Sequence, residues 1–195
     1  REHAPELLGH EEAQQLLDAL KKAAPKLVED LTPKTLPLST VVRVLQSLLG
    51  EKVPVRQMRQ IAESLVEHGA QTQDPAALVA AVRTALGRFI VQEINGMAPE
   101  LPVFTLNPAL ERVLQDSVSG QSSALEPGLA ERLHQSLGDM VQRQEARGEP
   151  AVLLVPGQVR PVLARLVRHS VPSLAVLAYS EVPEDKRLKL VGSIG

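Results

Sequence analysis

The chain has 195 residues, with 21 lysines and arginines against 23 aspartates and glutamates, five histidines, no cysteine and no tryptophan. This length allows one large or two small domains with a buried core. Without cysteine, disulfides, thiolate-ligated metals and a cysteine nucleophile are excluded. The longest stretch free of Asp, Glu, Lys and Arg has 12 residues, against the roughly 18 apolar residues of a membrane span. We therefore expect this fragment itself to be soluble.

The charges are spread evenly along the chain. Residues 1–31 carry a net charge of −3, residues 32–100 a net charge of +1, and residues 101–195 none. No segment has the basic excess typical of a nucleic-acid interface, so we predict no nucleic-acid partner. The chain starts without methionine or a signal sequence, and we interpret it as a piece of a longer protein.

Apolar residues recur at helical spacing through the first hundred residues. Stripes at i, i+3, i+4 and i+7 predict helices around residues 13–20, 41–48 and 58–65. We therefore predict an all-α subdomain over residues 32–100. Residues 1–31 are predicted to be connector helices at the tail of a preceding subdomain.

Capping residues set the expected ends of these helices. Ser39 and Thr40 are predicted to cap the second helix, which Gly50 can end, and Gly69 can end the third. Asp74, followed by a proline, predicts the start of a fourth helix that continues to about residue 94, where Asn-Gly stops it.

The last 95 residues change character after a proline-bearing junction at residues 97–102. Four short strands are predicted, at residues 103–106, 151–155, 174–178 and 187–194. Three helices are predicted, after Asn107-Pro108, after Glu126-Pro127 and around residues 159–166. Two buried strands joined by one helix predict a parallel unit. The expected fold class is therefore α+β with several subdomains: an all-α helical subdomain, then a small α/β subdomain at 101–195.

No motif predicts catalysis. The histidines form no i, i+4 pair, and Pro156-Gly157 lacks the other glycines and the lysine of a phosphate loop. Ser122 lies in a polar loop without the preceding strand of a nucleophile elbow, although a hydrolase centred on it stays open as an alternative. We predict no catalytic residue, no metal and no cofactor, and hence no enzyme.

The helices at residues 39–66 also fit a DNA-binding helix-turn-helix. Arg56 and Arg59 would then reach the DNA. Glu63 and Glu67 follow on the same helix and would oppose phosphate binding. We favour a packed helical hairpin and keep a DNA-binding regulator as the alternative.

Three arginines on one predicted helix suggest a surface for a protein partner. Arg160, Arg165 and Arg168 fall within roughly 140° on a helical wheel. No acidic residue occurs between Glu149 and Glu181. Arginine forms bidentate pairs with carboxylates, which suits an acidic partner. The alternative is that these residues serve solubility and the helix dipole.

Several sequence phrases, taken in order, are similar to one protein family. They lie at residues 25–31, 37–49, 53–59, 85–88, 125–133, 181–187 and 191–195. From about Gly9 onward the chain resembles the C-terminal cytoplasmic region of the FlhA family of flagellar type III export-gate proteins. It departs from the family pattern at Gln57 and in the loop at residues 119–124. Export-gate proteins of the virulence injectisomes share the same plan, and the phrases at 85–88 and 125–130 favour the flagellar branch.

The resemblance implies a bacterial inner-membrane protein whose spans lie upstream and whose cytoplasmic region forms a homononameric ring. It implies a docking platform for export substrates, chaperones and the ATPase complex during protein secretion and flagellum assembly. In the family, the stalk subunit of that complex enters clefts between neighbouring C-terminal subdomains. We expect Arg160, Arg165 and Arg168 to contribute to such a surface.

Overall fold

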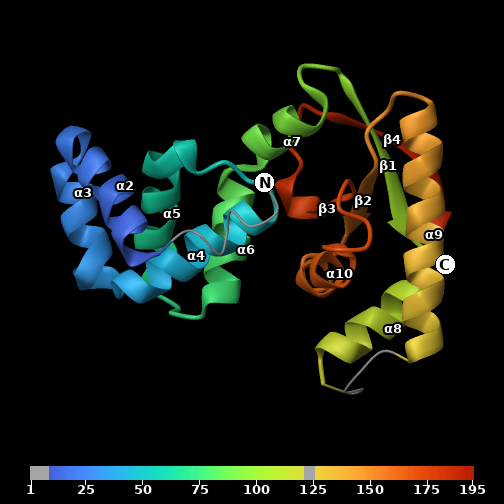
Figure 1. The fold of residues 1–195 in the computed structure, drawn as a ribbon, viewed down its shortest axis with the longest axis horizontal. Coiled ribbons are helices and arrows are strands. Elements are labelled where there is room, and N and C mark those ends of the chain that lie inside the picture. The colour runs from blue at the N-terminus through green and yellow to red at the C-terminus, as the bar shows by residue number, and fades with distance from the viewer. Residues whose placement is uncertain (1–8, 121–125) are drawn as a thin grey trace. The chain divides into compact units, whose positions relative to one another are not determined.

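The computed structural model describes residues 9–120 and 126–195, which form two compact units (Figure 1). The first unit extends to Ile90 and the second begins at Val91. The subdomain limits expected after residues 31 and 100 stay a prediction. As expected, the described part is a helical region followed by a small α/β region, so the α+β fold class is confirmed.

The described part of the first unit contains helices and no strand. In chain order the elements are α2 (His10–Ala23), α3 (Pro25–Glu29), the irregular turns Asp30–Thr35, α4 (Leu38–Gly50), the single turn Val55–Gln57, α5 (Met58–Gly69), α6 (Pro75–Ala85) and the start of α7 (Gly87–Asn95).

The predicted apolar stripes form the core of this unit. Side chains of α2, α4, α5 and α6 are fully buried, among them Leu17, Leu45, Leu48, Ile61, Leu65 and Leu78. Burying each such side chain contributes about 1.5–3 kcal/mol. The core also takes in an arginine: Arg83 on α6 is only 2% exposed, and its Nη1 lies 3.8 Å from the Glu51 Oε2.

Three predicted helix boundaries are confirmed and one is wrong. Gly50 is the last residue of α4. Asp74 caps α6 by accepting a hydrogen bond from the Ala76 N–H at 3.3 Å, and Gly69 is the last residue of α5. Ser39 and Thr40 do not cap α4. Pro37 holds that position instead, because its backbone is extended and its carbonyl accepts the first hydrogen bonds of the helix.

The fourth predicted helix is two helices. The chain departs from helical dihedrals at Leu86 (φ −94°, ψ 9°), and α7 begins at Gly87. Glycine weakens a helix interior, while the buried Leu86 side chain packs in the core. The predicted stop is confirmed, since α7 ends at Asn95 and Gly96 has φ +62°.

The second unit is built on a parallel sheet of four strands, β1 (Glu100–Leu106), β2 (Val152–Val155), β3 (Ala175–Ala178) and β4 (Arg187–Ile194). Their order is β3-β2-β1-β4, and each neighbouring pair is parallel. The helices are α8 (Pro108–Val118), α9 (Pro127–Ala146) and α10 (Arg160–Val167). The predicted parallel unit over β2, α10 and β3 is confirmed, as is the Asn107 cap, which accepts from the Ala109 N–H at 2.9 Å.

One face of this sheet packs against all three helices. The cluster joins Phe104, Leu153 and Val176 from the strands to residues such as Leu114, Leu137 and Leu163 from the helices. In Figure 1, α9 runs along β1 and β4, and α10 lies by β3. The carboxyl ends of the four parallel strands therefore share one edge, from which Asn107, Pro156 and Tyr179 continue the chain.

β1 starts earlier than the sequence suggests, at Glu100 within the predicted irregular junction. Pro102 stands inside it, opposite Lys189 of β4. A proline normally disrupts a central strand because it has no N–H to donate. Here β2 pairs only with Phe104 and Thr105, so at Pro102 β1 has a strand partner only in β4. No helix among the described residues combines the length and apolarity needed to cross a bilayer.

Candidate functional site

The three predicted partner-binding arginines all belong to α10 or its end, but they lie in different environments. Arg160 is the first residue of α10, Arg165 is in its last turn, and Arg168 is the residue that follows the helix. Arg165 and Arg168 are exposed, whereas Arg160 is only 4% exposed. The structure thus places two of the three on the surface, whereas Arg160 is enclosed within the unit.

Arg160 takes part in a buried polar cluster at the carboxyl edge of the sheet. Its Nε lies 3.8 Å from the Glu181 Oε2, with both side chains at most 5% exposed. Its Nη1 donates to the Val176 carbonyl at 3.4 Å. The Glu181 Oε1 in turn accepts from the Ala178 N–H at 3.1 Å. A buried arginine requires such a partner, because an isolated charge in the interior is strongly destabilising.

These contacts fix the start of α10 against β3 and the turn that follows it. The parallel arrangement explains why they meet: α10 begins after the carboxyl end of β2, and Glu181 follows the carboxyl end of the neighbouring β3. Sequence reasoning missed the pair. The available signal was that Glu181 is the first acidic residue after Glu149.

Arg165 and Arg168 are three positions apart, so they occupy adjoining parts of one helix face. The turn that follows is held to α9 by a 2.7 Å hydrogen bond between the Ser170 Oγ and the His134 Nδ1. The exposed pair therefore sits on a short helix that is fixed at its start by Glu181 and just beyond its end by His134.

Tyr179 is a further surface residue that sequence reasoning missed. It follows β3 and is 50% exposed. Partial burial, with a smaller contribution from the negative charge of Glu111 on α8, raises the pKa of its hydroxyl above the usual 10.0. Tyrosine combines apolar area with a hydrogen-bonding tip, which suits it to protein interfaces.

The described residues contain no group of three His, Cys, Asp or Glu side chains placed to hold a metal ion. Ser122, the candidate nucleophile, lies outside the described residues.

Comparison with known proteins identifies the family. The model of the FHIPEP family matches residues 1–187. The chain belongs to the FHIPEP family. Flagellar biosynthesis protein FlhA of Escherichia coli K12 is 45% identical over 194 residues, which are all of this chain and 28% of the relative. The chain thus spans just over a quarter of that relative's length and corresponds to its C-terminal region.

Solved structures of SctV and CdsV proteins share the fold of this FHIPEP chain. The nonameric cryo-EM structure of EPEC SctV-C has a TM-score of 0.87 and 27% identity, covering 99% of this chain and 59% of that one. The complex of CdsV and CdsO from Chlamydia pneumoniae gives a TM-score of 0.89 and 26% identity, covering 98% of this chain and 57% of that one.

Proposed function

We propose that this chain is the C-terminal part of a flagellar type III export gate and serves there as a docking platform during protein secretion and flagellum assembly. The observation that carries the proposal is the match to FlhA, 45% identical along the whole chain. A likeness over both units supports a shared role more strongly than a likeness of fold does. The parent protein would lie in the bacterial inner membrane, with this region in the cytoplasm.

The proposed partners are neighbouring copies in a homononameric ring, export substrates with their chaperones, and the ATPase complex with its stalk subunit. A nonameric assembly of SctV-C and a complex of CdsV with CdsO support the first and the last of these by analogy. Repeated weak sites on a ring raise avidity without strong individual contacts.

Within this platform, Arg165 and Arg168 are the proposed contacts for acidic side chains of the stalk subunit. Both are exposed on one helix face, and charge-assisted hydrogen bonds to carboxylates are among the stronger polar contacts at interfaces. Arg160 contributes to this surface indirectly, because its pairing with Glu181 fixes the start of α10. In this proposal it does not contact the partner.

The test is a charge reversal on the exposed pair. In the 195-residue chain, Arg165→Glu with Arg168→Glu should weaken binding of the purified stalk subunit at least about tenfold, the effect of losing charge-assisted contacts. The same change in the parent protein should reduce swimming motility. Far-UV circular dichroism should not change, because neither side chain is buried.

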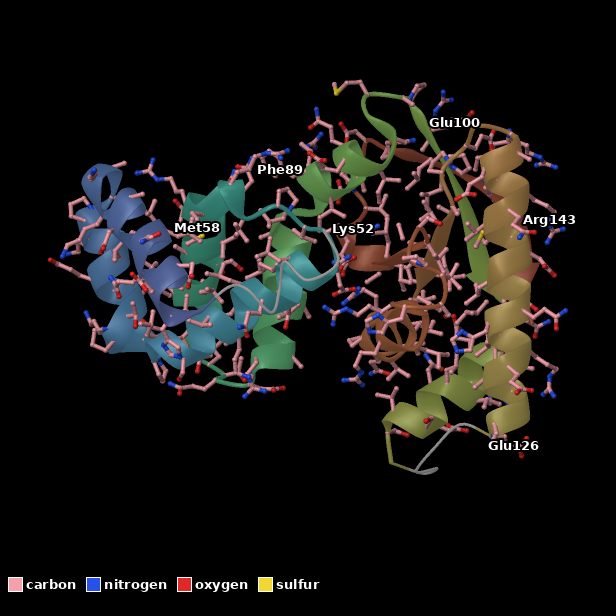
Figure 2. All side chains as sticks on the ribbon, viewed as in Figure 1. Lys52, Met58, Phe89, Glu100, Glu126 and Arg143 are labelled. Atoms are coloured by element: carbon pink, nitrogen blue, oxygen red, sulfur yellow. The ribbon has the colours of Figure 1, made fainter. Side chains whose placement is uncertain are left out.

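A matched control has two arginines at the end of another helix. Arg143 and Arg147 are exposed at the end of α9, and Figure 2 labels Arg143 on the outer side of that helix. Arg143→Glu with Arg147→Glu makes the same change in charge and should leave stalk binding intact. If both double variants weakened stalk binding equally, the effect would come from net charge and not from a contact at α10. Unchanged binding in the α10 variant would refute the assignment.

Two alternatives are less well supported. An injectisome role is suggested by the structural neighbours, but their identities of 26–27% lie well below the 45% shared with FlhA. A DNA-binding regulator built on α4 and α5 is not favoured, because the family match extends through both of these helices.

A further inference from the structure

An open groove of about 450 Å³ lies between α5 and α6 in the first unit. The two helices pack side by side (Figure 1). α5 contributes Glu63, Ser64 and Glu67 to the groove, and α6 contributes Ala81 and Ala85. Gln60 and His68 of α5 and Thr84 of α6 complete the lining. The α5 side therefore carries two carboxylates among polar side chains, and the α6 side carries small side chains.

The carboxylates carry uncompensated charge. Glu63 and Glu67 are one helical turn apart and exposed, and like charges at this spacing repel one another. Within residues 9–120 and 126–195, neither carboxylate lies within ion-pair distance of a basic side chain. A cation entering the groove would relieve this repulsion.

Ser64 gives a second and independent sign of an absent partner. Ser64 is only 5% exposed and is one of the residues that line the groove. Its Oγ is buried and has no hydrogen-bond partner among the described residues. Buried hydroxyls are nearly always paired, because removing one from water without a partner is unfavourable.

We propose that this groove binds the side chain of an arginine from a partner protein. The guanidinium is planar and has five N–H donors, so some can serve the Glu63 and Glu67 carboxylates while one serves the Ser64 Oγ, which must rotate toward the groove to accept it. The small side chains of Ala81 and Ala85 leave room for the flat face and the methylene stem. A lysine ammonium would balance the negative charge of the two carboxylates, but it is too compact to donate to both of them and to the Ser64 Oγ.

This site belongs to a different unit from Arg165 and Arg168, and it has the opposite charge. It does not depend on the proposed role in export, because its geometry and its test involve only the groove and an arginine probe.

The test is an NMR titration of the 195-residue chain with Nα-acetyl-L-arginine amide at fixed ionic strength. The backbone amide signals of Ser64, Ala81 and their neighbours should shift and saturate. The citrulline analogue has nearly the same shape but no charge, and it should cause no comparable shift. Absence of saturable shifts with arginine, or equal shifts with citrulline, would overturn the proposal.

Variants test the individual contacts. Glu63→Gln with Glu67→Gln should weaken arginine binding at least about tenfold, and Ser64→Ala should weaken it severalfold without unfolding the chain. Glu131→Gln with Glu184→Gln removes two exposed carboxylates elsewhere and should not change binding. Unchanged binding in the groove variants would refute the site, and tighter binding of Nα-acetyl-L-lysine amide would refute the assignment to a guanidinium.

Discussion

Replacing Glu181 by glutamine tests the buried ion pair that fixes α10. Glutamine keeps the side-chain oxygen that accepts from the Ala178 N–H, and it replaces the charged oxygen that faces Arg160 with a neutral NH2 group, which donates and does not accept. Removing one member of a buried pair costs about 3–5 kcal/mol, because the other charge stays buried without compensation. The 3.8 Å separation of Nε and Oε2 is long for an ion pair, so we expect about 3 kcal/mol.

The assay follows unfolding of the second unit alone. Tyr179 is the only tyrosine and the chain has no tryptophan, so tyrosine fluorescence during urea unfolding reports on the unit that contains Glu181. With a slope of about 1.5 kcal/mol per molar urea for a unit of this size, the midpoint should fall by about 2 M. Glu184→Gln, which changes an exposed carboxylate three residues further along the chain, should change stability by less than about 0.5 kcal/mol.

A double variant separates loss of the pair from general disruption. Arg160→Met in the Glu181→Gln background also removes the buried positive charge of the arginine. Apolar replacement of a whole buried pair is often neutral or stabilising. The double variant should therefore be more stable than Glu181→Gln alone. A cost below about 1 kcal/mol for Glu181→Gln, or a double variant no more stable than the single one, would refute the reasoning.

Three further predictions concern local structure. Asp74→Ala removes the α6 cap and should cost about 1 kcal/mol in thermal or urea unfolding. Gly69→Ala should destabilise the chain by about 1–3 kcal/mol, since its Cβ would lie 2.7 Å from a side-chain atom. Gly138→Ala within α9 meets nothing within 4 Å and should stabilise the chain by about 0.5–1 kcal/mol. A Gly69→Ala variant more stable than the Gly138→Ala variant would contradict this reasoning. Ultraviolet titration of Tyr179 should give a midpoint above 10.0 that falls only partly in Glu111→Gln. Because the folded state holds this proton more tightly than the unfolded one, stability should decline as the pH rises through 10 and beyond.

The different environments of the α10 arginines matter for interpreting variants of this helix. Arg165 and Arg168 are exposed, so their substitution should alter binding without altering stability. Arg160 is buried against Glu181, so its substitution should alter stability first. A loss of partner binding in an Arg160 variant therefore reports on the position of α10 and not on a lost contact.

Local patterns predicted the element types well, because they depend on neighbouring residues. Helical stripes predicted α2, α4 and α5, and the Asp-Pro and Asn-Pro pairs predicted the starts of α6 and α8, where the cap hydrogen bonds are observed. The predictions that failed depended on more distant groups. The helix breaks at Leu86, whose side chain is buried in the core. Pro102 is tolerated within β1 because β2 does not extend to it.

The sequence by itself determined the order of helices and strands, the parallel unit and the family, since these follow from periodicity, capping and a continuous run of matching phrases. Only the tertiary structure decided which charged and polar groups are free to bind. It buried Arg160 against Glu181 and left Arg165 and Arg168 exposed. It also left the buried Ser64 hydroxyl without a hydrogen-bond partner in a groove that two carboxylates line. The physical reason is that burial and pairing depend on elements distant in the chain, which helical spacing within one segment does not reveal.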